Sequence, residues 1–407
     1  MRNFYFLFFA QMVSLSGSVL NSVVSMFWVY SITGSLSGSI LSGFFPVAVY
    51  FLISTFAAAM VERGSKKNYV LLGEAAQALV FLAFFVMAKY GIKNIYAVYA
   101  LQGIVGLASA FFSPAMAAWE MEYIRDVYRK MAGKIHAAMA VLNLLFTLAG
   151  GLLAARVPFH YIFLYNAASF GAAFLIEVFI REPARGAPKA EVAGRTRLLS
   201  EMAEGFRYVI AEKPAVFSSI LMLSMINMFF APLANVMPVF VKAGLNLGPD
   251  AFSYAMIASM AGSMAAGFSV NKVGRLNISM LLLFCVVDAG LCFLMYFLTG
   301  LGALLLVMMV VGFIVSLMTI AVKIEVSTVK PEYYCKVQAL SENISGLLVP
   351  VGIVIMSVLA GAGGVRTPFL FSGIALLAVA GLVRLLIFSG RFGRILAAQG
   401  STASGGI

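Results

Sequence analysis

The sequence predicts an all-α membrane protein with twelve transmembrane helices in two six-helix, pseudo-symmetric halves. Of its 407 residues, 62% are hydrophobic and only 11% are charged, and the mean hydropathy is +0.99. A water-soluble domain does not have this composition. The second observation is a series of long apolar runs. The third is a pair of short charged turns of similar sequence, about half a chain apart.

The apolar runs have the length that a membrane helix requires. A bilayer core of about 30 Å is crossed by a helix of about 20 residues. The runs are continuously apolar and lack the short alternating segments of barrel strands, which excludes a membrane barrel. The first run is too long for a signal-peptide core and is expected to remain as a membrane helix. The runs cover residues 4–30, 38–61, 70–89, 95–119, 131–155, 159–181, 214–241, 251–270, 277–298, 302–324, 335–361 and 366–389.

The two charged turns indicate that the chain is duplicated. The first turn, between the second and third runs, reads Glu62-Arg-Gly-Ser-Lys-Lys67. The second, between the eighth and ninth runs, reads Asn271-Lys-Val-Gly-Arg275. Both place an acid or amide, a base, a small residue and another base in the same order. The duplication predicts an N-terminal half over 1–181 and a C-terminal half over 214–389.

A polar segment, residues 182–213, separates the predicted halves. It begins with a composition typical of flexible linkers. Its second part has apolar residues at helical spacing among charges, which predicts an amphipathic helix along the cytoplasmic membrane surface. Residues 390–407 read as a cytoplasmic tail. The apolar positions of the predicted helix are Leu198, Leu199, Met202, Phe206, Val209 and Ile210.

The net charge of +12 is explained by membrane orientation rather than by nucleic acid. With the N-terminus in the cytoplasm, most of the 28 lysines and arginines fall in cytoplasmic segments. This bias predicts that both termini are cytoplasmic and that the number of spans is even. The basic residues left on the outer side are Lys89, Lys93, Arg156, Lys242 and Arg366.

The sequence predicts neither a metal site, nor a cofactor, nor an enzyme. Cys285, Cys292 and Cys335 lie in or beside late helices without metal-binding spacing, and are interpreted as reduced packing residues. The chain has no nucleophile and base pair of the kind that enzymes use. It also lacks a phosphate-binding loop of the Gly-x-x-x-x-Gly-Lys-Ser/Thr type, which favours a secondary carrier over an ATP-driven pump.

Short strings distributed in order through nearly the whole chain carry a family resemblance. With the two turns and the two halves, they resemble the major facilitator superfamily, and more closely its macrolide-efflux and siderophore-exporter branch. The strings are Gln11-Met-Val-Ser14, Trp28-Val-Tyr30, Ser113-Pro114, Glu204-Gly-Phe-Arg207, Lys336-Val-Gln338 and Pro350-Val-Gly352.

In this family the turn after the second helix acts as a cytoplasmic latch between the halves. The resemblance implies that role here, with Glu62 facing the N-terminus of the eleventh helix, where the helix dipole favours an acid. Ser65 replaces the usual glycine and Asn271 the usual acid, which predicts a weaker latch. The alternative is that the turns only anchor the chain by their positive charge. The predicted latch residues are Glu62, Arg63, Lys66, Lys67, Glu120 and Glu122, with the mirrored set Asn271, Gly274, Arg275 and Glu325.

Polar residues that share one face of a membrane helix indicate a cavity, because polar groups are costly in lipid. Several helices that line the central cavity in the family carry such a face. The alternative is close helix packing through small residues, which applies to the serines more than to the amides. The predicted cavity residues are Gln11, Ser14, Ser18, Asn21, Gln102, Asn143, Thr147, Asn227, Asn235, Ser316 and Thr319.

Ionisable residues inside the apolar runs are the candidates for ion coupling. Glu342 is the first choice, with an ion pair to Lys323 as the structural alternative. Asp288 is a further candidate, although a structural hydrogen bond is an alternative because its helix is peripheral in the family. Glu74 and Glu177 are interpreted as reaching the membrane interface.

The sequence predicts a multi-pass secondary transporter of the cell (inner) membrane that acts as a monomer. The resemblance implies export of a small amphipathic organic compound, such as a drug, a macrolide or a siderophore-like product, by proton antiport. The arginine that many proton-driven relatives carry in the fourth helix is Gln102 here. Nutrient or lipid transport and a non-transporting membrane sensor or scaffold remain alternatives.

Overall fold

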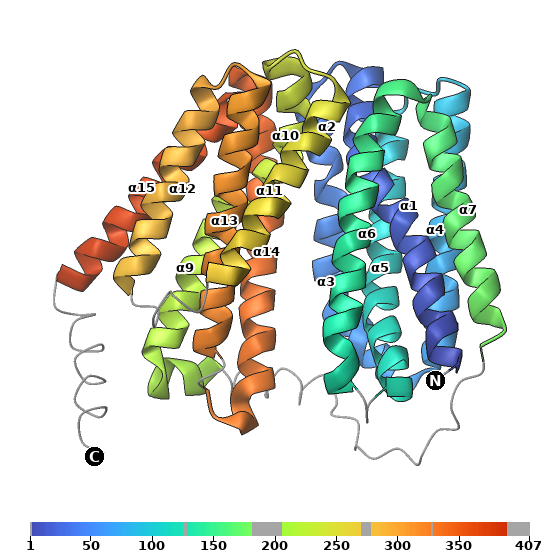
Figure 1. The fold of residues 1–407 in the computed structure, drawn as a ribbon, viewed down its shortest axis with the longest axis horizontal. Coiled ribbons are helices and arrows are strands. Elements are labelled where there is room, and N and C mark those ends of the chain that lie inside the picture. Colours follow the sequence, from blue (N-terminus) through green and yellow to red (C-terminus); the bar gives the residue numbers. More distant parts are fainter. Residues whose placement is uncertain (1, 125–127, 181–205, 270–277, 327–328, 389–407) are drawn as a thin grey trace. The chain divides into compact units, whose positions relative to one another are not determined.

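The computed structural model describes residues 2–124, 128–180, 206–269, 278–326 and 329–388 (Figure 1). These residues form helices and no strands. Eleven helical segments are long and apolar enough to cross a membrane, and a shorter apolar segment is Val141–Arg156. The all-α class predicted from the apolar runs is therefore confirmed.

The helices follow the predicted runs closely. Those up to residue 178 are α1 (Arg2–Thr33), α2 (Leu36–Ser42), α3 (Phe44–Arg63), α4 (Lys66–Lys89), α5 (Ile95–Ile124), α6 (Tyr128–Arg156) and α7 (Phe159–Val178). Those from residue 214 are α9 (Pro214–Phe230), α10 (Leu233–Val239), the π-helix η1 (Phe240–Gly244), α11 (Pro249–Ser269), α12 (Ile278–Phe297), α13 (Leu301–Val326), α14 (Pro331–Gly363) and α15 (Thr367–Phe388).

Two predicted spans are interrupted helices. The run 38–61 forms α2 and α3, which meet at Gly43. Ser35 is the N-cap of α2, and its hydroxyl accepts a hydrogen bond from Gly38 N at 3.0 Å. The run 214–241 divides into α9, α10 and η1. Pro232 and Pro238 lie in this run and donate no backbone hydrogen bond, which explains why a regular helix does not continue through it.

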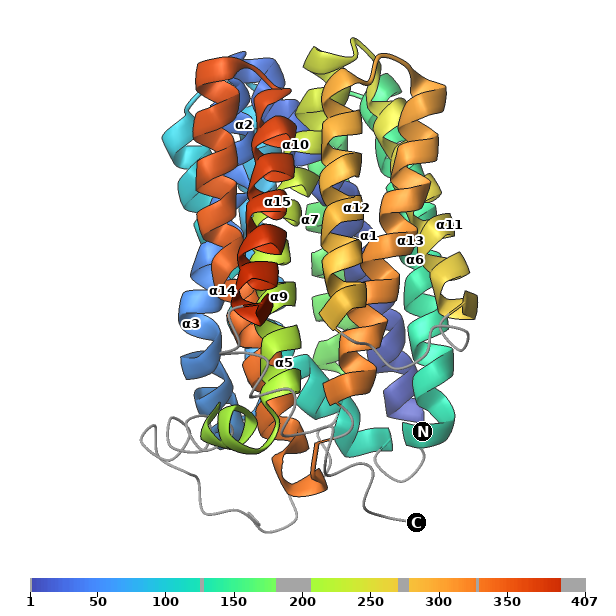
Figure 2. The same ribbon diagram turned by 90° about the vertical axis from the view of Figure 1, so that its left-hand side faces the viewer.

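The helices form two compact units. The first comprises residues 1–193 with 235–257, and the second comprises 194–234 with 258–407. In the first unit α1 packs on α6 and α7, and α4 packs on α5 and α7. In the second, α12 packs on α15 and α9 on α14 (Figure 2). The predicted halves stay a prediction, since most of the linker and the tail lie outside the described residues.

Two apolar clusters form the core of the first unit along α1, α4 and α7. In one, the Trp28 ring contacts Phe84 and Phe163 edge-on, with ring centroids 5.7 Å and 5.1 Å apart. The other contains Leu7 of α1, Val70 of α4, and Ile180 just beyond α7. Polar side chains are buried along the same three helices between the two clusters.

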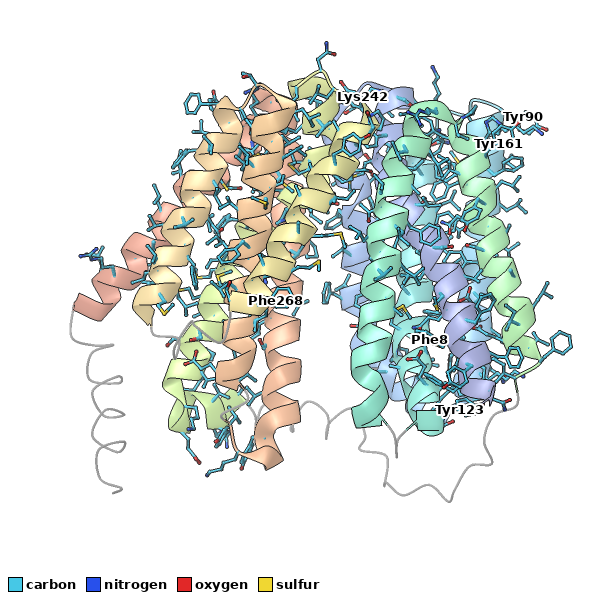
Figure 3. The ribbon with its side chains drawn as sticks, in the orientation of Figure 1. Phe8, Tyr90, Tyr123, Tyr161, Lys242 and Phe268 are labelled. Atoms are coloured by element: carbon cyan, nitrogen blue, oxygen red, sulfur yellow. The ribbon has the colours of Figure 1, made fainter. Side chains whose placement is uncertain are left out.

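Aromatic residues lie at both ends of the first unit. Tyr90 and Tyr161 are 69% and 57% exposed and lie at one end, while Tyr123 lies at the opposite end (Figure 3). Tyr123 is partly buried. Tyrosines at the two ends of a helix bundle are typical of membrane proteins, where they lie at the headgroup level.

Candidate functional site

The predicted cavity face of α1 is bonded largely within its own helix. Ser18 Oγ donates to the Ser14 carbonyl oxygen at 3.0 Å, and Asn21 Oδ1 accepts from Ser25 Oγ at 2.7 Å. Ser14 is only 4% exposed, and the Oε1 atom of Gln11 is buried without a hydrogen-bond partner in the described part of the chain. Hydroxyls that bond back to the helix are satisfied without a ligand.

The other predicted cavity residues of the first unit lie in different surroundings. Gln102 is buried, and Asn143 Nδ2 donates to the Met139 carbonyl oxygen at 2.9 Å. The carbonyl oxygen of Thr147 accepts a 2.6 Å hydrogen bond from Ser253 Oγ on α11. Asn235 Oδ1 lies directly against the α-carbon of Gly43. Thr147 and Asn235 therefore take part in helix packing, and their role in a cavity stays a prediction.

In the second unit the predicted cavity residues are Asn227, Ser316 and Thr319. All three are partly buried. Thr319 Oγ1 donates to the Val315 carbonyl oxygen of its own helix at 2.8 Å. Their role in a cavity stays a prediction.

Of the predicted coupling residues, the structure describes the side chain of Asp288 and not those of Glu342 and Lys323. Asp288 is completely buried on α12, and its two carboxyl oxygens accept no hydrogen bond in the described part of the chain. Cys285 and Cys292, on either side of it along α12, are free and buried. The structural hydrogen bond considered for Asp288 is thus not formed by these residues.

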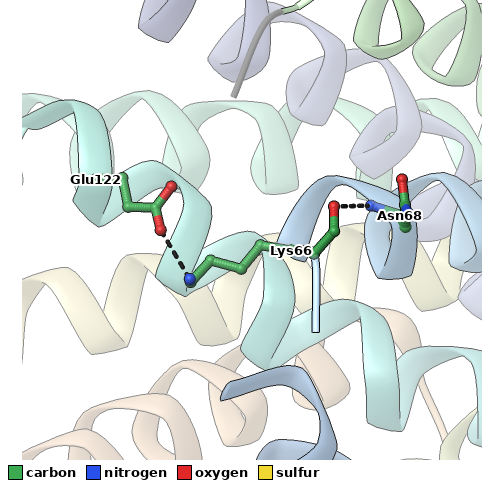
Figure 4. A network of polar contacts seen from close by, with 4 residues as sticks. Lys66, Asn68 and Glu122 are labelled. Atoms are coloured by element: carbon green, nitrogen blue, oxygen red, sulfur yellow. Dashed lines mark hydrogen bonds and ion pairs between the residues drawn. The ribbon is translucent and has the colours of Figure 1, made fainter. Parts of the chain in front are cut away.

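The first charged turn joins α3, α4 and α5. Lys66 Nζ lies 2.7 Å from Glu122 Oε1, as Figure 4 shows, and the two side chains are 19% and 28% exposed. Ser65 begins α4 by accepting a hydrogen bond from Asn68 N at 3.2 Å. Of the two predicted latch acids near the end of α5, Glu122 is the one that pairs with Lys66. One oxygen of Glu120 is buried and accepts no hydrogen bond from the residues that the structure describes.

The remaining latch candidates are described only in part. Lys67 Nζ donates to the carbonyl oxygens of Val178 and Ile180, at 2.6 and 2.8 Å, and thereby ties α4 to the end of α7. Glu325 accepts a 2.7 Å hydrogen bond from Ser219 Oγ of α9. Burial raises the pKa of Glu325, and the Ser219 hydrogen bond opposes this shift. The other predicted latch residues lie outside the described side chains, namely Glu62, Arg63, Asn271, Gly274 and Arg275.

Glu74 and Glu177 are the residues that sequence reasoning misplaced. They were interpreted as reaching the membrane interface, but both are completely buried inside the first unit. The signal was present in the helical spacing. Glu74 lies four residues from Val70 on α4 and Glu177 lies four from Ala173 on α7, so each shares a face with buried apolar residues.

Comparison with known proteins identifies the family. A sequence profile of the Major Facilitator Superfamily matches residues 6–324. The chain is 23% identical over 398 residues to the uncharacterized MFS-type transporter YvqJ of Bacillus subtilis, a match that covers 95% of this chain and 90% of the relative. It is 22% identical over 390 residues to macrolide efflux protein A of Streptococcus pyogenes, which covers 93% of this chain and 94% of the relative.

Solved structures of transporters share the fold. The nucleoside transporter NupG superposes with a TM-score of 0.74 at 14% identity and covers 95% of this chain and 99% of its own. A bacterial homologue of the human lysosomal transporter Spinster superposes with a TM-score of 0.68 at 12% identity and covers 93% and 95%. These relatives and structural neighbours are transporters and not enzymes. Since the family profile matches residues 6–324, the resemblance inferred from the sequence is confirmed, and this multi-pass membrane transporter belongs to the Major Facilitator Superfamily.

Proposed function

We propose that this transporter exports an amphipathic organic compound, of the size and polarity of a macrolide, by proton antiport across the cell membrane. The observation that carries the proposal is the match to macrolide efflux protein A over 93% of this chain. The character of the predicted cavity supports it. The candidate side chains are amides and hydroxyls without fixed charge, which suit a bulky, weakly polar solute better than a phosphate or an inorganic anion.

Alternating access around a midplane site is the mechanism that this fold supports best. In the proposal both termini are cytoplasmic, and the Lys66–Glu122 pair contributes to a latch on that side. Glu342 carries the coupled proton, because an acid on the polar face of a membrane helix is the default candidate for ion coupling.

The proposal is tested with the full chain in proteoliposomes under an imposed pH gradient. Uptake of a macrolide and of an amphipathic dye into inside-out vesicles is compared between wild type, Glu342→Gln and the control Glu212→Gln. Glu212 is a suitable control because its side chain is 53% exposed and takes no part in the proposed coupling. We expect gradient-driven flux in wild type and the control, and its loss in Glu342→Gln.

The other possible results of this experiment contradict either the role of Glu342, the direction of transport or transport itself. Flux that persists in Glu342→Gln assigns coupling to another group. Wild-type flux in the opposite direction contradicts export and favours nutrient uptake. Ligand binding without flux for any compound contradicts transport by this chain under these conditions and favours a sensor.

A further inference from the structure

Two carboxyl groups lie inside the first unit, between helices that pack closely on each other. Glu74 belongs to α4 and Glu177 to α7, and these helices lie side by side (Figure 1). Both side chains are completely buried. The two carboxyl groups interact electrostatically with each other. Neither has a role in the predicted cavity or in the predicted latch.

No ion pair to either carboxyl group is formed within the part of the chain that the structure describes. All four oxygens are buried without a hydrogen-bond donor among the described residues. The Ser14 hydroxyl of α1 lies near Glu74, and it donates to the Gln11 carbonyl oxygen at 3.3 Å.

The charged and titratable groups of the neighbouring helices do not neutralise the pair. On α4, Lys67 donates its hydrogen bonds to the carbonyl oxygens at the end of α7 rather than to Glu177. On α5, Glu120 is itself an acid with one unpartnered oxygen, and Glu122 is paired with Lys66. On α1, the group that interacts with Glu74 is the neutral Ser14. The α6 side chains 128–137 lie outside the described ones.

An ionised carboxylate in such surroundings loses its hydration without compensation. Two ionised carboxylates side by side in a medium of low dielectric also repel each other. Both costs disappear when the pair takes up protons, because a protonated carboxyl group is neutral and can donate a hydrogen bond to a neighbouring acceptor. Two buried acids on neighbouring helices that are close enough to interact electrostatically favour uptake of a proton by one of them.

We propose that Glu74 and Glu177 form a proton-binding pair inside the N-terminal bundle. The pair is a second proton site, separate from Glu342. Its position beside α1 links its protonation to the helix that carries the predicted cavity residues Gln11, Ser14 and Ser18. The link between the pair and coupled transport rests on the proposed function. Proton binding by the pair is independent of that function.

Infrared difference spectroscopy of the full-length protein in lipid nanodiscs tests proton binding directly. The carbonyl stretch of a protonated carboxyl group is followed during a pH titration without substrate, in wild type, Glu74→Gln, Glu177→Gln and the double variant. Glutamine has the shape of a neutral glutamic acid, so the variants are expected to fold. Asp288→Asn is the control, because it removes a completely buried acid from the second unit.

We expect a component of the carboxyl band that titrates in wild type and in Asp288→Asn, and that is absent from the double variant. Each single variant is expected to keep one titrating group, with its midpoint about one pH unit or more below that of wild type, because the neighbouring charge is gone. The single variants decide the question if the double variant does not fold.

An unchanged band in the double variant overturns the proposal. So does a wild-type band that responds to replacement of sodium by choline at constant pH, because the pair would then bind a metal cation instead of a proton. Transport is not part of this measurement. A protein with the expected band that fails to export contradicts the proposed function alone, and an exporter without the band contradicts the pair alone.

Discussion

Tyr208 stacks face to face on Tyr333 in the second unit, with ring centroids 4.0 Å apart and planes within 2° of parallel. Tyr208 belongs to the helical residues 206–212 that precede α9, and Tyr333 lies in the first turn of α14. Lys330 Nζ lies 5.5 Å from the centroid of the Tyr208 ring and 2.8 Å from Glu212. The segment that the sequence places along the membrane surface thus docks on the beginning of α14.

Replacing Tyr208 tests this docking. Tyr208→Ala removes a side chain that is 5% exposed, and we expect a loss of about 3 kcal/mol in the free energy of unfolding. Limited trypsin digestion after Arg207 and Lys213 should accelerate. Tyr208→Phe is the control, and should be neutral or slightly stabilising because the Tyr208 hydroxyl is buried without a hydrogen-bond partner in the described part of the chain. Equal protease protection in both variants would contradict the docking.

Two glycines allow α11 and α13 to cross at close range. The α-carbon of Gly262 lies against the Met309 carbonyl oxygen, and that of Gly312 against the Ser259 carbonyl oxygen. Ser263 Oγ also donates to the Gly312 carbonyl oxygen at 3.2 Å. Membrane helices that approach this closely depend on small residues at the crossing.

Alanine at Gly312 or Gly262 is therefore expected to push the two helices apart. Because the neighbouring atoms are backbone and cannot rotate away, we expect a cost of about 3 kcal/mol for each substitution. Gly267→Ala on α11 is the matched control, since nothing lies within 4 Å of an added methyl group there. It should be neutral or stabilise the helix by up to about 1 kcal/mol. Thermal unfolding in detergent measures all three, and a similar effect at Gly267 and Gly312 would refute the explanation.

The Ser219–Glu325 hydrogen bond predicts a pH-dependent effect of Ser219→Ala. Burial raises the pKa of Glu325, so its contribution to stability is present at low pH and is lost as the pH rises through the folded-state pKa. Ser219 lessens that loss by donating to the ionised carboxylate. We expect Ser219→Ala to cost about 1.5 kcal/mol at pH 8 and little at pH 4, the low end for a charged hydrogen bond because the site is partly solvated.

Thermal unfolding at both pH values, with Ser219→Thr as the control, measures this effect. Threonine retains the hydroxyl and should keep the wild-type pH profile. An Ala variant whose loss of stability is the same at both pH values would show that the hydrogen bond to the ionised form does not matter.

The Lys66–Glu122 pair predicts a modest coupling energy. The pair is short, at 2.7 Å, but both side chains retain contact with solvent. A double-mutant cycle with Lys66→Met and Glu122→Gln should give about 0.5–1 kcal/mol, decreasing at high salt. A cycle with Lys66→Met and Glu212→Gln, two sites in different units, should give no coupling. Coupling of the same size in both cycles would mean that the first reports something other than the ion pair.

The sequence alone was sufficient to predict the membrane class, the all-α fold and the family. Continuous apolar runs determine the class and the fold locally, since a segment in lipid must satisfy its own backbone hydrogen bonds and only a helix does so. The same reasoning misses the breaks at Gly43 and at Pro232. At these positions the helix is broken although the sequence remains apolar. The break depends on single residues within the run, which an average over the run does not register.

The tertiary structure decided which partner each polar residue meets. Helical periodicity places Glu74 and Glu177 on definite faces of their helices, but does not say which neighbouring helix covers those faces. Interface acids and buried acids therefore look alike in the sequence. The choice of Glu122 over Glu120 by Lys66, and the packing of Gly312 against Ser259, have the same origin. The physical reason is that contacts between helices depend on how separate segments pack, whereas the formation of each helix depends on its own residues.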